Sequence, residues 1–289
     1  MDIPTQTIMP SPESLPEVDI ILITHNHLDL TIQAIKSLYD NTPSEFRLII
    51  VDDSTDITPE YVRWLQKQHD NIDFIHSDEP YKSGNQIFNI GLAHCKNDYV
   101  ATVMNSVTVE PEWEVPALQF MEANPDVGIL GFKCLFPNGL IESAGIDFVL
   151  GCVPVDIASS LPGHRASNGY DCPAVQWAFA LLRRKAIPVL EEDVYHGFRG
   201  MDDIDNCFVV RKNGWRIMYF GLSAGYHAAR STRGVLPSDL VGISENLENH
   251  EIFYKRWGMW DIYQATKDKG GPWWNELVKA IGNPKEERD

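Results

Sequence analysis

The stretch Val18-Asp19-Ile20-Ile21-Leu22-Ile23-Thr24 decides the fold, and Leu48-Ile49-Ile50-Val51-Asp52-Asp53 repeats its pattern further along the chain. Nearly continuous apolar runs of this kind are typical of strands that are buried on both faces of a parallel sheet. Between them, apolar residues recur at helical spacing from residue 30 to 38, and Asn41-Thr42-Pro43 ends that helix. A β-α-β order implies parallel strands with right-handed crossovers, so we expect an α/β fold with a mostly parallel central sheet flanked by helices.

The rest of the chain continues this alternation and then becomes less regular. We expect residues 1–17 to be a disordered lead-in, 18–235 to form one domain, and 236–289 to be a C-terminal helical extension. Glycine, proline and short apolar stretches between 134 and 172 predict irregular strands and loops. The remaining patterns predict helices at about 59–69, 84–95, 112–123 and 202–213, and strands at 72–76, 99–104, 128–133, 177–182 and 215–220.

Composition narrows the class of partner and the compartment. The 289 residues include 41 acidic and 24 basic side chains, a formal charge of -17, which repels nucleic acid and anionic membranes but still allows a local basic loop to hold a diphosphate. The five cysteines are scattered and form no CxxC pair, which argues against a zinc site or a disulfide framework. The first residues hold no apolar signal segment, and no apolar run approaches the ~20 residues that cross a bilayer. We therefore expect a cytoplasmic protein without a transmembrane segment.

Polar residues follow the predicted strands where a ligand would bind. In open parallel sheets ligands lie at the carboxyl ends of the strands, which is where Thr24 and Asn26, Asp52 and Asp53, and Asn105 and Ser106 are placed. Carboxylates here can accept hydrogen bonds from a nucleobase or a ribose.

A further acidic group, Asp202-Asp203-Ile204-Asp205, opens a predicted helix, where the helix dipole favours negative charge. A carboxylate there can also take a proton from an attacking hydroxyl. His227 is followed by Arg230, Ser231 and Arg233, and arginine forks pair well with phosphate oxygens.

Together and in this order, these segments resemble inverting glycosyltransferase family 2, which has the Rossmann-like GT-A fold. The resemblance covers roughly residues 18–257, and the segment from Gly128 to Gly145 resembles the rhamnosyltransferase-like branch of the family. It is carried by Val18–Asn26, Leu48–Asp56, Gly84 with Asn89-Ile90-Gly91, Gly128–Lys133 with Phe136–Gly139 and Ala144-Gly145, Met201–Asp205 with Arg211–Trp215, and Tyr226-His227.

The resemblance implies an enzyme that transfers a sugar from a UDP-, dTDP- or GDP-linked donor to a glycan or another hydroxyl acceptor. Residues 18–107 would be the nucleotide-binding half and 108–235 the acceptor half. Asp203, helped by Asp202, would be the general base. The nucleotide would contact Thr24, Asn26, Asp52, Asp53, Lys82, Asn85, Asn105 and Ser106, and the diphosphate would contact His227, Arg230, Ser231 and Arg233.

The sequence departs from the family at the metal-binding motif. The family carries a final carboxylate that binds Mg²⁺ or Mn²⁺, and Val107 stands at that position. Either His227, the diphosphate and water hold the ion, or cationic side chains such as Lys82, Arg230 and Arg233 neutralise the leaving group, or turnover is lost.

Each of these residues also has a purely structural explanation. The aspartates fit turns and helix starts, with Asp205 more structural than Asp203, and Trp177 fits either the core or a platform on which an acceptor sugar stacks. The C-terminal tryptophans fit packing onto the domain, or a peripheral membrane or partner contact.

At the level of function, a catalytically silent domain that binds sugar nucleotide or glycan is the main alternative. A nucleotidyltransferase is disfavoured because no glycine-rich phosphate loop follows the first strand. The oligomeric state stays open.

Overall fold

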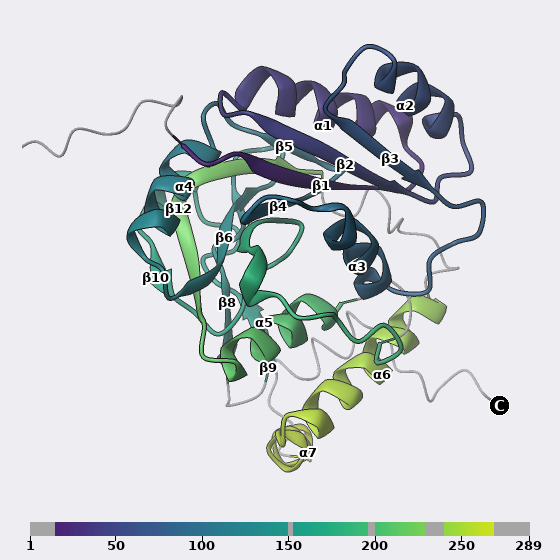
Figure 1. Ribbon diagram of the computed structural model, residues 1–289. Helices are drawn as coiled ribbons and strands as arrows, with labels where there is room; N and C mark the ends of the chain where they lie inside the picture. Colours follow the sequence, from purple (N-terminus) through teal and green to yellow (C-terminus); the bar gives the residue numbers. More distant parts are fainter. Residues whose placement is uncertain (1–14, 150–152, 196–199, 229–239, 269–289) are drawn as a thin grey trace, which may run out of the picture.

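The structure is a computed structural model that describes residues 15–149, 153–195, 200–228 and 240–268 (Figure 1). Most of the predicted lead-in lies outside these ranges, and so do Arg230, Ser231 and Arg233 of the predicted diphosphate loop.

One mixed sheet forms the centre of the molecule, and four neighbouring strands in it are parallel. These are β3 (Ile72–His76), β2 (Phe46–Asp52), β1 (Val18–Thr24) and β4 (Tyr99–Met104). The sheet continues with β11 (Phe179–Arg183), which is antiparallel to both its neighbours, and then with β6 (Val127–Leu135), β12 (Arg216–His227) and β10 (Tyr170–Asp171). The predicted α/β fold with a mostly parallel sheet is confirmed.

Alternation along β1 divides the core into two layers. Ile20 and Leu22 belong to the layer under α1 (Leu28–Asn41), whereas Ile21 belongs to the layer under α3 (Gly84–His94). In Figure 1, α1 and α2 (Thr58–Gln66) lie above strands β1 to β3, and α3 lies below them. Because both faces are covered, both sets of side chains in the strand must be apolar, which explains the continuous apolar run.

The second half of the chain is more regular than the sequence predicts. Between 134 and 172 it forms β7 (Ile141–Ser143), β8 (Ile146–Val149), β9 (Val153–Asp156), a short 3₁₀ helix (Gly163–Ala166) and β10. The last strand, β12, continues past the predicted end at 220, because an irregularity between Phe220 and Ala224 lets it pair with β5 (Val107–Val109) as well as β6. The remaining elements are α4 (Glu114–Ala123), a 3₁₀ turn (Arg184–Ala186), α5 (Asp202–Lys212), α6 (Leu240–Arg256) and α7 (Trp260–Asp268).

The C-terminal helix α6 packs onto the main core. Phe253 and Tyr254 are buried, and the Phe253 ring lies 5.3 Å from the ring of Phe208 on α5. Packing of this kind favours the structural explanation of Trp257, whose ring lies 5.2 Å from that of Phe208, whereas Trp273 and Trp274 lie outside the described residues. Within the described ranges, none of the helices combines the length and the apolar character needed to cross a bilayer.

Candidate active site

Asp52 lies at the centre of a buried hydrogen-bond cluster at the carboxyl ends of three strands. Its Oδ1 accepts from Thr24 Oγ1 at 2.6 Å and from Ser54 Oγ at 2.5 Å. Its Oδ2 lies 2.6 Å from His76 Nδ1 at the end of β3. The parallel register that pairs Thr24 with Asp52 and Asp52 with His76 brings these groups together. Both carboxylate oxygens are therefore engaged, and His76 is a member of the site that the sequence did not indicate.

The neighbouring Asp53 pairs with His25. The Asp53 Oδ1 lies 2.8 Å from His25 Nδ1, and its Oδ2 accepts from the backbone N–H of Tyr81 at 3.0 Å. Burial opposes ionisation, but the hydrogen bonds from His25 and Tyr81 outweigh it and lower the pKa of Asp53. The same hydrogen bond to Asp53 raises the pKa of the half-exposed His25 above its ordinary value. An ionised aspartate thus faces the site at neutral pH.

Asn26 organises the loop that follows β2. It adopts a left-handed conformation with φ of 54°, which asparagine tolerates better than most residues. Its Oδ1 accepts from the backbone N–H groups of Thr55 at 2.8 Å and Asp56 at 3.1 Å, while its own N–H donates to Ser54 Oγ at 2.6 Å. The structure therefore places Asn26 beside Asp52 and Asp53, as predicted, with its amide oxygen committed to the loop.

Asn105 and Ser106 lie on the same edge after β4, and Val107 turns away from it. The Asn105 amide donates to the carbonyl of Asn26 at 3.0 Å and to Thr31 Oγ1 at 3.1 Å. The Ser106 carbonyl accepts from the N–H of Ala228 at 2.8 Å. The Val107 side chain is fully buried in the core layer under α1. A side chain at position 107 therefore points into the core in this conformation.

His227 pairs with a carboxylate that the sequence did not single out. Its Nδ1 lies 2.7 Å from Glu142 Oε2, and both side chains are mostly buried. Glu142 belongs to β7, which pairs with β6 and so comes close to the end of β12. No local pattern could reveal this contact, because Glu142 falls in the stretch predicted to be irregular.

The donor set does not fit a metal site built by the protein alone. Glu142 engages one nitrogen of His227, which leaves Nε2 as the only ring atom for a ligand, and Val107 supplies no oxygen. Among the described residues, no group of three or more His, Cys, Asp or Glu side chains is arranged to hold an ion. Mg²⁺ and Mn²⁺ prefer several oxygen ligands, so His227 by itself does not make a site for either.

The predicted base helix begins against the predicted nucleotide-binding half. A Cβ atom added to Gly84, the first residue of α3, would lie 2.3 Å from Asp202 Oδ2, so the carboxylate sits directly over this glycine. Asp203 Oδ1 accepts from the N–H of Ile204 at 2.9 Å. The structure therefore brings the start of α5, with Asp202 and Asp203, to the start of α3.

Asp205 contacts α6, as expected of the more structural of the aspartates at the start of α5. Its Oδ1 accepts from Trp257 Nε1 at 2.5 Å and lies 3.0 Å from Arg256 Nε. Burial raises the pKa of Asp205, and the hydrogen bond from Trp257 and the charge of Arg256 oppose that effect.

The predicted nucleotide ligands on α3 differ in their surroundings. Lys82 is exposed, and its backbone N–H donates to Gln86 Oε1 at 2.8 Å. Asn85 is buried, and its amide donates to the Glu191 carbonyl at 2.8 Å and accepts from Asn206 Nδ2 at 2.7 Å. Lys82 is thus accessible to a ligand, whereas Asn85 links α3 to α5.

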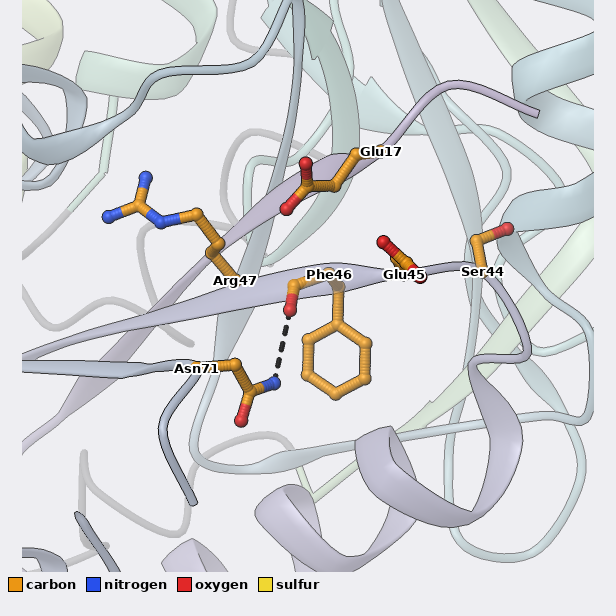
Figure 2. A pocket seen from close by; sticks show the side chains of 6 residues that line it. All are labelled: Glu17, Ser44, Glu45, Phe46, Arg47 and Asn71. Carbon is orange, nitrogen blue, oxygen red and sulfur yellow. Dashed lines mark hydrogen bonds between the residues drawn. The ribbon is translucent and has the colours of Figure 1, made fainter. Parts of the chain in front are cut away.

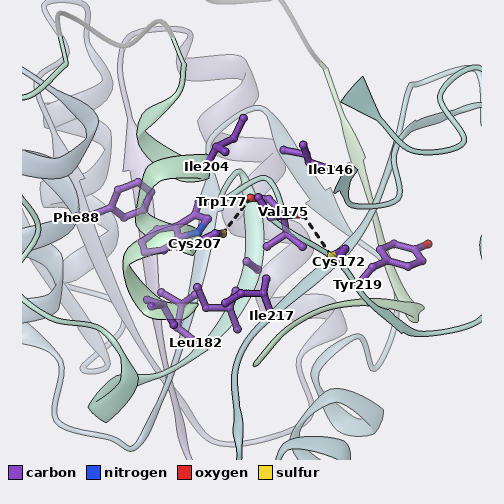
Figure 3. Close-up of a cluster of buried hydrophobic side chains, with 14 of the residues drawn as sticks. Phe88, Ile146, Cys172, Val175, Trp177, Leu182, Ile204, Cys207, Ile217 and Tyr219 are labelled. Carbon is purple, nitrogen blue, oxygen red and sulfur yellow. Dashed lines mark hydrogen bonds between the residues drawn. The ribbon is translucent and has the colours of Figure 1, made fainter. Parts of the chain in front are cut away.

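The stacking role predicted for Trp177 requires correction. The Trp177 side chain is only 1% exposed and packs edge-on against Phe88 at 5.1 Å, in the cluster that also holds Cys207 (Figure 3). A sugar cannot stack on a ring that has no exposed face. The sequence left both environments open. The structure decides between them because Trp177 comes just before β11, which pairs with β4 and β6 in the interior of the sheet.

A separate surface hollow lies at the opposite edge of the sheet (Figure 2). Its volume is about 370 Å³, and residues at the amino ends of β1 and β2 contribute most of its lining. Figure 2 shows Arg47, Glu17 and Phe46 among them. Since ligands of parallel sheets bind at carboxyl ends, this hollow does not correspond to the predicted nucleotide site.

Comparison with known families and structures agrees with this arrangement. The model of the family described as Glycosyl transferase family 2 matches residues 19–189. An uncharacterized protein, y4gI, of Sinorhizobium fredii (strain NBRC 101917 / NGR234) is 25% identical in an alignment of 236 residues that covers 77% of this chain and 25% of that protein. The chain thus spans about a quarter of the length of that curated relative.

Several solved structures share the fold at low sequence identity. GalNAc-T7, solved with UDP, GalNAc and Mn²⁺, has a TM-score of 0.61 at 11% identity and matches 74% of this chain and 44% of its own. The mannosyltransferase PcManGT from Pyrobaculum calidifontis, in complex with GDP-Man and Mn²⁺, has a TM-score of 0.58 at 17% identity, and the match covers 94% of this chain and 81% of PcManGT. S. aureus TarS 1-349 has a TM-score of 0.52 at 15% identity, and the match covers 82% of this chain and 69% of TarS 1-349. These likenesses show a GT-A-like fold.

Proposed function

The chain belongs to glycosyl transferase family 2, and we propose that it transfers a sugar from a nucleoside-diphosphate sugar to a hydroxyl group of a glycan, with inversion. One connected contact path carries this proposal. Asp53 accepts from the N–H of Tyr81, the chain then enters α3 at Gly84, and Gly84 lies against Asp202. A cluster suited to a nucleoside and a helix that starts with carboxylates therefore share one edge of the sheet.

In this proposal the nucleotide-binding half is 18–107 and the acceptor half is 108–235. The nucleoside contacts the edge on which Thr24, Asn26, Asp52, Asp53, Asn105 and Ser106 lie. The side chains of Thr24, Asp52, Asp53 and Asn105 already make internal hydrogen bonds, and in this proposal those bonds fix the shape of that edge.

Asp203 acts as the general base. Its carboxylate takes the proton of the acceptor hydroxyl, and the hydroxyl oxygen forms a bond to the anomeric carbon of the donor sugar. The bond from that carbon to the diphosphate oxygen breaks on the opposite face, and the nucleoside diphosphate leaves with the electron pair. The start of α5 suits a carboxylate that must stay ionised to accept a proton, because the helix dipole favours negative charge there.

Charge on the leaving diphosphate has to be compensated at the same edge. We assign this to Lys82, which is exposed, and to His227 with Arg230 and Arg233, which follow it in the sequence. Preorganised cations are an effective way to stabilise a leaving anion. Glu142 holds the His227 ring in one orientation and leaves Nε2 for the ligand.

A catalytically silent binding domain is the second candidate, and one observation favours it. Val107 is fully buried and pairs with His227 between β5 and β12, so it does not supply the family's metal carboxylate, and the nearby carboxylate of Glu142 is engaged with the His227 ring. The carboxylates of α5 favour the enzyme, since a silent domain has no need of a base.

Calorimetric titration with UDP, dTDP, GDP and CMP, each with Mn²⁺ and with EDTA, tests the proposal. We expect one nucleoside diphosphate to bind, and the corresponding sugar donor to release that diphosphate when a glycan acceptor is present. Binding without release, across donors and acceptors, would support the silent domain. Binding that survives EDTA would indicate that side chains neutralise the negative charge of the diphosphate. Loss of binding in EDTA would indicate that a bound metal ion neutralises it.

A further inference from the structure

We propose that Arg256, near the end of α6, is a positioning residue for the candidate base, and this inference rests on the proposed function. Arg256 lies on a helix that the family match at 19–189 does not include. Its side chain joins α6 both to the first turns of α5 and to the segment that anchors α3. Figure 1 shows α6 next to α5, on the side of the sheet that carries α3.

The first contact of Arg256 is with a buried carboxylate of the base helix. Arg256 Nε lies 3.0 Å from Asp205 Oδ1, and the side chain of Asp205 is only 3% exposed. Trp257 donates to the same oxygen at 2.5 Å and packs edge-on against Phe208 at 5.2 Å. Asp205 is one turn after Asp202 and two residues after Asp203, so these contacts fix the turn that carries the proposed base.

The second contact of Arg256 is with Glu191, whose segment holds the start of α3. Arg256 donates to both carboxylate oxygens of Glu191, one of them at 3.2 Å. The backbone carbonyls of residues 190–192 accept from three side chains of the α3 region. The bonds are Ser83 Oγ to Glu192 at 2.8 Å, Asn85 Nδ2 to Glu191 at 2.8 Å and Asn89 Nδ2 to Leu190 at 2.8 Å.

Direct contacts also join α3 to α5. Asn206 donates to Asn85 Oδ1 at 2.7 Å, and Asp202 lies over Gly84. The base helix therefore touches α3 on one side and α6 on the other. Arg256 contacts both α5 and the 190–192 segment from the α6 side, as Asn85 does from the α3 side. A guanidinium suits this task because its donors point in fixed, separate directions, which a lysine ammonium cannot reproduce.

Loss of Arg256 would disturb the start of α5, which carries the proposed base, more than the cluster of Asp52 and Asp53. Asp205 would remain buried with Trp257 as a neutral donor, and the nearby acidic groups Glu191 and Asp202 offer no compensating charge. A buried carboxylate that loses its cation is strongly destabilised, so we expect the first turns of α5 to shift. The cluster of Asp52 and Asp53 shares no hydrogen bond with Arg256 in the described part of the chain.

The test compares Arg256→Ala with Lys255→Ala, its neighbour on α6. Lys255 pairs with Glu251 on the exposed face of the helix, so its removal changes the net charge equally without touching α5. We expect Arg256→Ala to lower kcat on the order of 10²-fold, the typical cost of misplacing a reacting group by about 1 Å. The Kd for the nucleoside diphosphate should stay within about threefold of wild type, and Arg256→Lys should recover part of kcat.

Amide hydrogen exchange tests the same link without relying on turnover. In Arg256→Ala the amides of residues 202–206 and 190–192 should exchange faster than in Lys255→Ala, while those of β1 and β2 stay unchanged. If wild type shows no transfer, the proposed function fails and the exchange result still decides the link. Equal exchange in the two variants, or a parallel loss of kcat and nucleotide affinity in Arg256→Ala, would overturn the positioning role.

Discussion

Replacing Gly84 by alanine separates the stability of α3 from the placement of Asp202. An added Cβ would lie 2.3 Å from Asp202 Oδ2, whereas ordinary contacts begin at 3.4 Å, so the carboxylate must retreat by about 1 Å. Gly84 is the first residue of α3, and among the described residues beyond its chain neighbours and the backbone of its own helix, no atom but Asp202 Oδ2 lies within 3.4 Å of the added carbon. The substitution therefore acts on one carboxylate and on little else.

Two opposite effects are expected from Gly84→Ala. Alanine is favoured over glycine within helices by up to about 1 kcal/mol, which offsets the cost of moving the end of a side chain. The free energy of unfolding should therefore stay within about 1 kcal/mol of wild type. A displacement of about 1 Å at a reacting group costs about 10²-fold in rate, or roughly 2.7 kcal/mol of barrier.

Three measurements on Gly84→Ala decide the outcome: release of nucleoside diphosphate at saturating acceptor, urea denaturation, and calorimetric nucleotide binding. Gly91→Ala is the matched control on the same helix, because its Cβ would lie 2.8 Å from a side-chain carbon of Ile21 in the core. That control should lose about 1–3 kcal/mol of stability and keep its turnover. Wild-type turnover in Gly84→Ala would refute the reasoning that Asp202 is held in place for the reaction.

Other substitutions probe the remaining parts of the site. Asp203→Asn should reduce transfer by about 10²–10⁴-fold and leave nucleotide affinity unchanged, as followed by product release and calorimetry; equal loss of both would remove the base assignment. Val107→Asp should cost about 3–5 kcal/mol in urea denaturation, because it buries an unpaired charge, and should not raise Mn²⁺ affinity. His25→Gln should destabilise most between pH 3.8 and pH 6.5, the ordinary pKa values of aspartate and histidine, because the contributions of the lowered pKa of Asp53 and the raised pKa of His25 are both fully present there. The deficit should shrink as pH rises through the raised pKa of folded His25, and a deficit that grows with pH in urea titrations would contradict the ion pair.

Local patterns were enough to predict the fold of residues 18–107. The apolar runs of β1 and β2 and the helical spacing of α1 are each properties of a short segment, and the parallel register then follows from their order. That register brings Thr24, Asp52 and Asp53 to one edge, so their proximity was predictable. His76 was missed because its role depends on the side-chain geometry at the end of β3.

The fold of residues 108–235 depends on contacts between distant segments, and the sequence was correspondingly less informative there. Glu142 reaches His227 only because β7 and β12 both pair with β6. Trp177 could be core or surface by pattern alone, and its burial follows from its position just before β11, between β4 and β6. The partners of Asp205 come from α6, about fifty residues away, where no spacing rule applies.

The position of β11 has a consequence for how the chain acquires its structure. This strand lies between β4 and β6, so during synthesis β4 has no permanent neighbour on that side until residues 179–183 have emerged. An open strand edge readily pairs with other chains, and long-range pairing of this kind is slow to form. Fragments that end before residue 179 should therefore aggregate, and a useful truncation of this protein has to retain β11 even when only nucleotide binding is wanted.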